Sequence, residues 1–185
     1  MHTTTVEERI FENIKRVILE EEFQLKNLAN KGIYFMPEQA FFYQISKSLL
    51  VSKQLIFGDA KVQWLKDMKV GDAGVVDLIL KVEKQGSIET FMFQFKFRDD
   101  YEAYLRDAMT LTKIHQHGYN VRNPQLFLCA LVDTTDGLAD HRIQEIEASN
   151  DVKLERAGEF LVFSTDDEIH RKNVQCVVCL WKVLP

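Results

Sequence analysis

The sequence is poor in the residues that loosen a chain or carry it into a membrane. Its 185 residues include 8 Gly and 3 Pro, too few for a disordered or fibrous protein. No apolar run exceeds Leu126–Val132, far short of the roughly 18–20 residues that a membrane-spanning helix needs. The first residues form neither a basic nor an apolar segment. We therefore expect no signal peptide, no membrane partner and a cytoplasmic protein.

Positive charge and cysteine are also scarce. The chain has 23 Lys and Arg against 28 Asp and Glu, a net charge of −5, which argues against indiscriminate binding to DNA but leaves room for a local basic cleft. Of the 3 cysteines, Cys176 and Cys179 have the spacing of a zinc or redox pair. In a strand, however, that spacing points the two thiols to opposite faces. We expect buried structural thiols.

What the chain does have is a large apolar share, 46%, with 13 Phe to fill a core. No repeat or linker divides it, so we expect one domain over residues 1–185. Apolar periodicity and turn residues predict an α/β protein with a mixed central sheet flanked by helices. The predicted helices cover residues 6–28, 37–49, 99–118 and 136–150, and the predicted strands cover 61–65, 75–83, 88–98, 125–133, 160–164 and 174–183.

The second and third predicted strands carry the most information about function. Phe91, Phe93, Phe95 and Phe97 alternate along the third strand, so all four rings lie on one face and must be buried. The opposite face of that strand then carries Thr90, Met92, Gln94 and Lys96. By parity alone, Gln94 and Lys96 are neighbours on the same side.

The turn between these strands brings in a third polar residue. If the turn centres between Gln85 and Gly86, counting back along both strands places Asp77 directly opposite Gln94, with Lys96 on the diagonal. A carboxylate, an amide oxygen and a lysine suit Mg²⁺-assisted phosphodiester chemistry. The structural alternative is a polar triplet that faces solvent, or a Lys96 that extends from the strand end into water. A register shift of one residue would separate Asp77 from Gln94.

This pattern, Asp77 followed by Gln94-Phe95-Lys96, resembles the PD-(D/E)xK nuclease superfamily. The order of elements over residues 37–133 is similar to the αβββαβ core of that restriction-endonuclease-like fold, here with an extra N-terminal helix and C-terminal strands. The resemblance implies Mg²⁺-dependent (alternatively Mn²⁺-dependent) hydrolysis of nucleic-acid phosphodiesters. Asp77, Gln94 and the Phe95 carbonyl would be metal ligands, Lys96 the catalytic lysine, and Glu38 an auxiliary contact. The chain departs from the pattern in lacking a proline before Asp77 and in carrying Gln94 at an acidic position.

A nuclease also needs cations for phosphate, and DNA is the expected substrate. Candidate contacts are Lys47 on the helix that starts near residue 37, Arg98 after the third strand, and Arg106 and Lys113 on the next helix. A solvated helix face is the alternative role for each. The alternative to the enzyme is an inactive module of the same fold that binds nucleic acid or protein, and self-association as a homodimer is left open.

Overall fold

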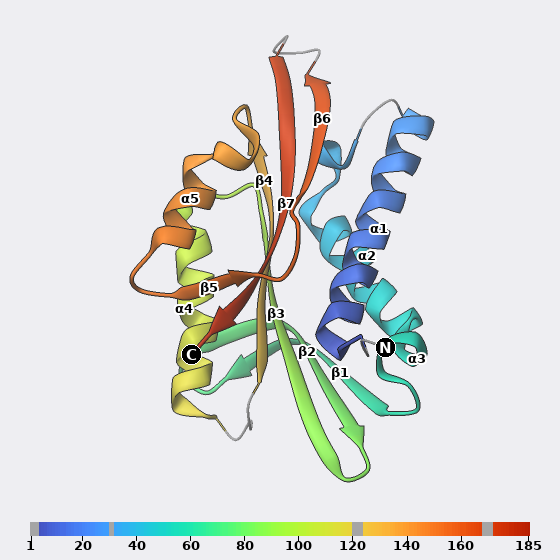
Figure 1. Cartoon of the computed structure of the whole chain (residues 1–185), viewed down its shortest axis with the longest axis vertical. Coiled ribbons are helices and arrows are strands. Elements are labelled where there is room, and N and C mark those ends of the chain that lie inside the picture. The colour runs from blue at the N-terminus through green and yellow to red at the C-terminus, as the bar shows by residue number, and fades with distance from the viewer. Residues whose placement is uncertain (1–3, 30–31, 120–123, 168–171) are drawn as a thin grey trace.

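A computed structural model of the chain describes residues 4–29, 32–119, 124–167 and 172–185. Within these ranges the protein is a mixed α/β structure in which one twisted sheet separates two layers of helices (Figure 1). Figure 1 shows helices α1, α2 and α3 on one side of the sheet and α4 and α5 on the other. None of the described helices is long and apolar enough to cross a membrane.

Local sequence signals set the helix boundaries. Thr5 and Glu8 cap the first helix reciprocally, with the Thr5 N–H donating to Glu8 Oε2 at 2.7 Å and the Glu8 N–H donating to Thr5 Oγ1 at 3.1 Å. Asp100 caps α4 by accepting the Ala103 N–H at 2.8 Å. The described helices are α1 (Val6–Ala29), η1 (Ile33–Phe35), α2 (Glu38–Val51), α3 (Lys53–Phe57), α4 (Tyr101–His117), η2 (Gly137–Ala139) and α5 (His141–Ala148).

The sheet has seven strands in the described residues, in the order β1-β2-β3-β4-β7-β5, with β6 also paired to β7. The pairing of β3 with β4 is parallel, and all other pairs are antiparallel. Helix α4 connects the two parallel strands, as a parallel crossover requires. The strands are β1 (Lys61–Val70), β2 (Gly74–Lys84), β3 (Ser87–Phe97), β4 (Gln125–Thr134), β5 (Lys153–Arg156), β6 (Leu161–Asp167) and β7 (Lys172–Leu184).

Each face of the sheet has its own apolar core. The phenylalanines of β3 lie on the face covered by α1, α2 and α3, as their alternation predicts, with Phe91, Phe93 and Phe95 buried. Met92 of β3, and the β4 residues whose side chains point to the opposite face of the sheet, pack against α4 and α5. Cys176 belongs to the first core and Cys179 to the second, and both are free, buried thiols. The prediction of structural cysteines on opposite faces is therefore confirmed.

Three parts of the fold differ from the sequence prediction. The helix expected over residues 136–150 divides into η2 and the shorter α5, because Asp140 adopts an extended ψ of 131° and caps a new helix through the Arg142 N–H. Strand β1 runs to Val70, beyond the end predicted at residue 65. The short elements η1, α3 and β5 are not predicted; with 3, 5 and 4 residues, they are too short to show a period of their own.

Candidate functional site

The hairpin of β2 and β3 has the register that the sequence predicts. Gln85 and Gly86 form the turn with φ values of +52° and +79°, the left-handed conformations of a two-residue hairpin. Pairing runs from Lys84 opposite Ser87 to Leu78 opposite Phe93. The next positions in this series would be Asp77 and Gln94, but the ladder ends one pair before them, and the two residues meet instead in the lining of one cavity.

Strands β2 and β3 separate at Asp77. Their pairing ends at Leu78, whereas β2 continues to pair with β1 as far as Gly74. We call the place where the two strands diverge the fork. Two side chains bridge it: Asp77 Oδ2 accepts the backbone N–H of Phe95 at 2.7 Å, and Gln94 Nε2 donates to the Val75 carbonyl at 2.7 Å. Asp77 thus replaces the backbone partner that Phe95 would have had in a continuous ladder.

This arrangement turns several oxygens toward the fork. The N–H and C=O of one strand residue point to the same neighbouring strand, so the Phe95 carbonyl points to the Asp77 side. Gln94 uses its amide nitrogen on Val75, which leaves its carbonyl oxygen available. Asp77 Oδ1 and Gln94 Oε1 accept no hydrogen bond from the described parts of the chain.

The fork opens into a cavity of about 280 Å³ between the two helical layers. It brings together five residues that the sequence predicts as a site: Glu38, at the first position of α2, with Asp77, Gln94, Phe95 and Lys96. The other residues around it are Gln39, Phe42, Lys66, Asp67, Val75 and Asp107. Four carboxylates and two ammonium groups therefore line this fork cavity.

Lys96 is held by helix α4 and not by Asp77. Its Nζ lies 3.1 Å from Asp107 Oδ2 and 3.8 Å from Asp99 Oδ2, and its side chain is 20% exposed. Burial works against the charged form, but the charge and hydrogen bond of Asp107 outweigh it and raise the pKa of Lys96 above its usual value. Lys96 is therefore a cation at neutral pH.

Asp77 is ionised only at some cost. Burial raises the pKa of Asp77 to about 6, against the lowering effect of the Phe95 N–H, and the negative charges of Asp107 and Asp67 add to the rise. A carboxylate whose charge is opposed by burial and by other carboxylates is typical of a functional site. A bound cation would relieve the same repulsion.

Sequence reasoning missed Asp67 and Asp107. Asp67 has a φ of +50°, uncommon for a residue other than glycine, and it interrupts the β1–β2 ladder opposite Asp77. Nothing in the local sequence marks that conformation. Asp107 could be recognised from the sequence, because its helical position is on the same stripe as the buried residues Ala103, Tyr104 and Ala108. A charged residue on a buried stripe indicates a partner across the helix–sheet interface.

The residues proposed for phosphate contacts are not gathered around the cavity. Lys47 is exposed on α2 and lies over the Tyr43 ring, 5.8 Å from its centroid. Arg106 and Lys113 are exposed on α4, and Arg106 adjoins Asp107. Arg98 turns away from the cavity: it donates to the Met36 carbonyl at 3.3 Å and lies 4.4 Å from the Phe97 ring centroid.

The fork cavity offers donors that suit Mg²⁺. Among the residues that the structure describes, no three Asp, Glu, His or Cys side chains are grouped to hold an ion. The donors here are mixed instead: the carboxylate of Asp77, the amide oxygen of Gln94 and the carbonyl of Phe95, with Glu38 also in the lining of the cavity. One or two carboxylates, neutral oxygens and several waters are the usual environment of protein-bound Mg²⁺.

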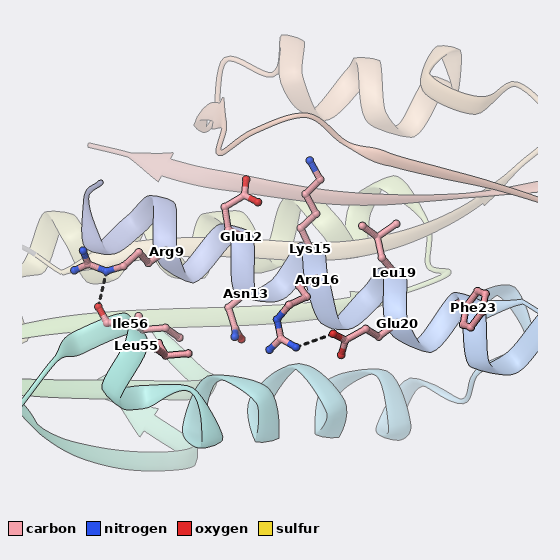
Figure 2. A pocket seen from close by; sticks show the side chains of 10 residues that line it. All are labelled: Arg9, Glu12, Asn13, Lys15, Arg16, Leu19, Glu20, Phe23, Leu55 and Ile56. Atoms are coloured by element: carbon pink, nitrogen blue, oxygen red, sulfur yellow. Dashed lines mark hydrogen bonds and ion pairs between the residues drawn. The ribbon is translucent and has the colours of Figure 1, made fainter. Parts of the chain in front are cut away.

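A larger cavity, of about 660 Å³, lies along helix α1 near α3 (Figure 2). Its polar groups are engaged structurally: Arg9 Nε donates to the Ile56 carbonyl at 2.8 Å, and Arg16 pairs with Glu20 at 2.8 Å (Figure 2). Phe23 and Leu55, at 70% and 80% exposure, supply much of the apolar surface. None of the residues that line this larger cavity is among the predicted catalytic residues, which line the fork cavity.

Comparison of the chain with protein-family models, with curated proteins and with solved structures finds no significant match.

Proposed function

We propose that this chain is a Mg²⁺-dependent nuclease with a restriction-endonuclease-like fold, whose active site is the fork cavity. The observation that carries the proposal is the contact between Asp77 Oδ2 and the Phe95 N–H at 2.7 Å. That contact fixes a carboxylate beside the Gln94-Phe95-Lys96 segment where two strands part. The order from α2 to β4, in which the short helix α3 precedes the three strands, helix α4 and strand β4, supports the same assignment.

Asp77, Gln94 and the Phe95 carbonyl would hold the ion, with Glu38 placed to contact it or its waters. When bound, Mg²⁺ would polarise a phosphate oxygen and make a bound water a better nucleophile. The chain's own contribution is to orient these oxygens. The Phe95 N–H fixes one oxygen of Asp77, and the Val75 carbonyl fixes the rotation of the Gln94 amide.

Lys96 would stabilise the negative charge that develops on the phosphate during cleavage. Asp107 and Asp99 hold its ammonium group in the cavity before substrate arrives, so little reorganisation is needed at the moment of reaction. Because the neighbouring carboxylates keep Lys96 protonated, its role is that of a fixed cation and not of a general base.

The substrate would be a nucleic acid, with DNA as the first candidate. Lys47, Arg106 and Lys113 are exposed cations on α2 and α4, the two helices that supply Glu38 and Asp107 to the cavity. We propose these three as outer phosphate contacts and leave out Arg98, whose side chain is held by the Met36 carbonyl and the Phe97 ring. The three cysteines are free, which fits the reducing cytoplasm in which we place the activity.

Cleavage of a substrate panel tests this proposal. Single-stranded and duplex DNA and RNA are incubated with the protein and Mg²⁺ or Mn²⁺, and products are resolved on denaturing gels. We expect metal-dependent cleavage of at least one substrate and none in EDTA. Asp59→Asn, which changes an exposed carboxylate outside the cavity, serves as the matched active control. No cleavage of any substrate with either ion would leave the alternative, an inactive binding module.

A further inference from the structure

The lining of the fork cavity includes two aromatic side chains, Phe42 and Phe95. Phe42 of α2 packs edge-on against Phe95, with ring centroids 4.8 Å apart and planes at 71°. Lys66 of β1 covers the Phe42 ring, with its Nζ 5.1 Å from the centroid. Both residues line the cavity, and neither contributes to the proposed metal site. A flat aromatic face beside a lysine is the combination on which unpaired bases stack.

The two lysines of the cavity are engaged to different degrees. Lys96 is 20% exposed and is paired with Asp107 at 3.1 Å. Lys66 is 57% exposed, and its nearest carboxylate, Asp67, lies at 3.5 Å and is itself 61% exposed. Exposed pairs of this kind contribute about 0–1 kcal/mol. Lys66 can therefore move from the ring to a phosphate and uncover Phe42 at little cost.

The size and charge of the cavity favour one unpaired nucleotide over a duplex. A volume of about 280 Å³ lies just below the range of about 300 to 1,000 Å³ that is usual for small-molecule sites. Duplex DNA also carries about one charge per 1.7 Å of its axis. A chain of net charge −5 with two lysines and four carboxylates around the site is poorly matched to that charge density.

We propose that the substrate of the fork cavity is single-stranded nucleic acid, in which one base stacks on Phe42 and an adjoining phosphate pairs with Lys66. The proposal rests on the proposed function for the identity of the site, but it concerns recognition and not cleavage. It assigns to Phe42 and Lys66 the selection of unpaired over paired strands.

Binding is measured by fluorescence anisotropy with a labelled oligonucleotide, free or annealed to its complement. The protein carries Asp77→Asn throughout, so that cleavage does not interfere. We expect the free strand to bind more tightly than the duplex. Phe42→Leu, which keeps an apolar side chain against Phe95, should weaken binding of the free strand about 5- to 150-fold, and Phe42→Trp should retain it. Lys66→Gln should lower the salt slope of log K by about 0.7.

The same helix supplies matched controls. Tyr43 is a second aromatic residue of α2, with its side chain 59% exposed, and it lies outside the cavity. Tyr43→Leu should leave binding of the free strand unchanged, and thermal melting of each variant confirms that it is folded. Equal or tighter binding of the duplex, or equal effects of Phe42→Leu and Tyr43→Leu, would overturn the proposal. Because no cleavage is measured, this result is independent of whether the protein is a nuclease.

Discussion

Replacing Lys96 with Met should lower the rate of metal-dependent cleavage about 10²- to 10³-fold, the usual effect of removing one preorganised stabiliser of transition-state charge. Methionine keeps the apolar stem of the side chain and removes only the ammonium group. The proposed metal ligands stay in place, so Mn²⁺ affinity should be retained while single-turnover cleavage falls. Lys69→Met, at an exposed position of β1 outside the cavity, should cleave at the wild-type rate.

Loss of Lys96 also leaves Asp107 without its partner at 3.1 Å. An unpaired, partly buried carboxylate destabilises a fold, so the activity of Lys96→Met must be separated from its stability. The double variant Lys96→Met/Asp107→Asn removes both charges and should recover thermal stability without recovering cleavage. Recovery of cleavage in the double variant would show that Lys96 acts only through the fold and would contradict its catalytic role.

Replacing Asp77 with Asn should have opposite effects on function and on stability. Asparagine can still accept the Phe95 N–H through its amide oxygen, but it brings no charge to the ion. We expect metal affinity to fall by about 10²-fold or more, because mutating even a residue that only hydrogen-bonds to a metal ligand lowers metal affinity about 10–100-fold. Calorimetric titration with Mn²⁺ measures this loss of affinity. Asp59→Asn provides the control with the same change in net charge.

The gain in stability follows from the pKa of Asp77. Because that pKa is raised from 3.8 to about 6 in the folded protein, the folded state holds the proton more tightly than the unfolded state. Ionisation of Asp77 therefore destabilises the fold, fully above about pH 6 and not at all below about pH 4. In EDTA at pH 7.5, Asp77→Asn should stabilise the protein by about 1–3 kcal/mol.

Melting temperatures across pH measure this effect. The difference between Asp77→Asn and wild type should be about 2–4 °C per kcal/mol at pH 7.5 for a chain of this size, and it should shrink to nothing near pH 4. A variant that is less stable than wild type at neutral pH would show that the Asp77 charge supports the fold. That result would contradict the claim that the ionised Asp77 destabilises the fold and that a bound cation relieves this destabilisation.

The parts of the site that follow from strand parity could be predicted from the sequence. One face for the β3 phenylalanines, and the β2–β3 register as far as Leu78 opposite Phe93, depend only on alternation and on a two-residue turn at Gln85-Gly86. These are local rules with a period of two. They can be applied without knowing which helices pack on the sheet. The same series would place Asp77 opposite Gln94, but the ladder ends one pair earlier, and the two residues come together in the lining of the fork cavity.

The parts that depend on packing between distant elements could not be predicted in the same way. Asp107 reaches Lys96 because α4 lies across β3 and β4, a relation that no local pattern contains. The separation of β2 from β3 beyond Leu78, where β2 stays paired with β1, and the positive φ of Asp67 are likewise not contained in any local pattern. The sequence therefore predicts five residues that line one cavity, but not the cavity itself or the other residues around it.

A crystal soaked in MnCl₂ and measured at the manganese absorption edge tests the central claim most directly. The account predicts an anomalous peak in the fork, within coordination distance of Asp77 Oδ1, Gln94 Oε1 and the Phe95 carbonyl, that disappears in Asp77→Asn. A crystal with no peak in the fork at saturating Mn²⁺, or with its peaks only at other surface carboxylates, would contradict the account.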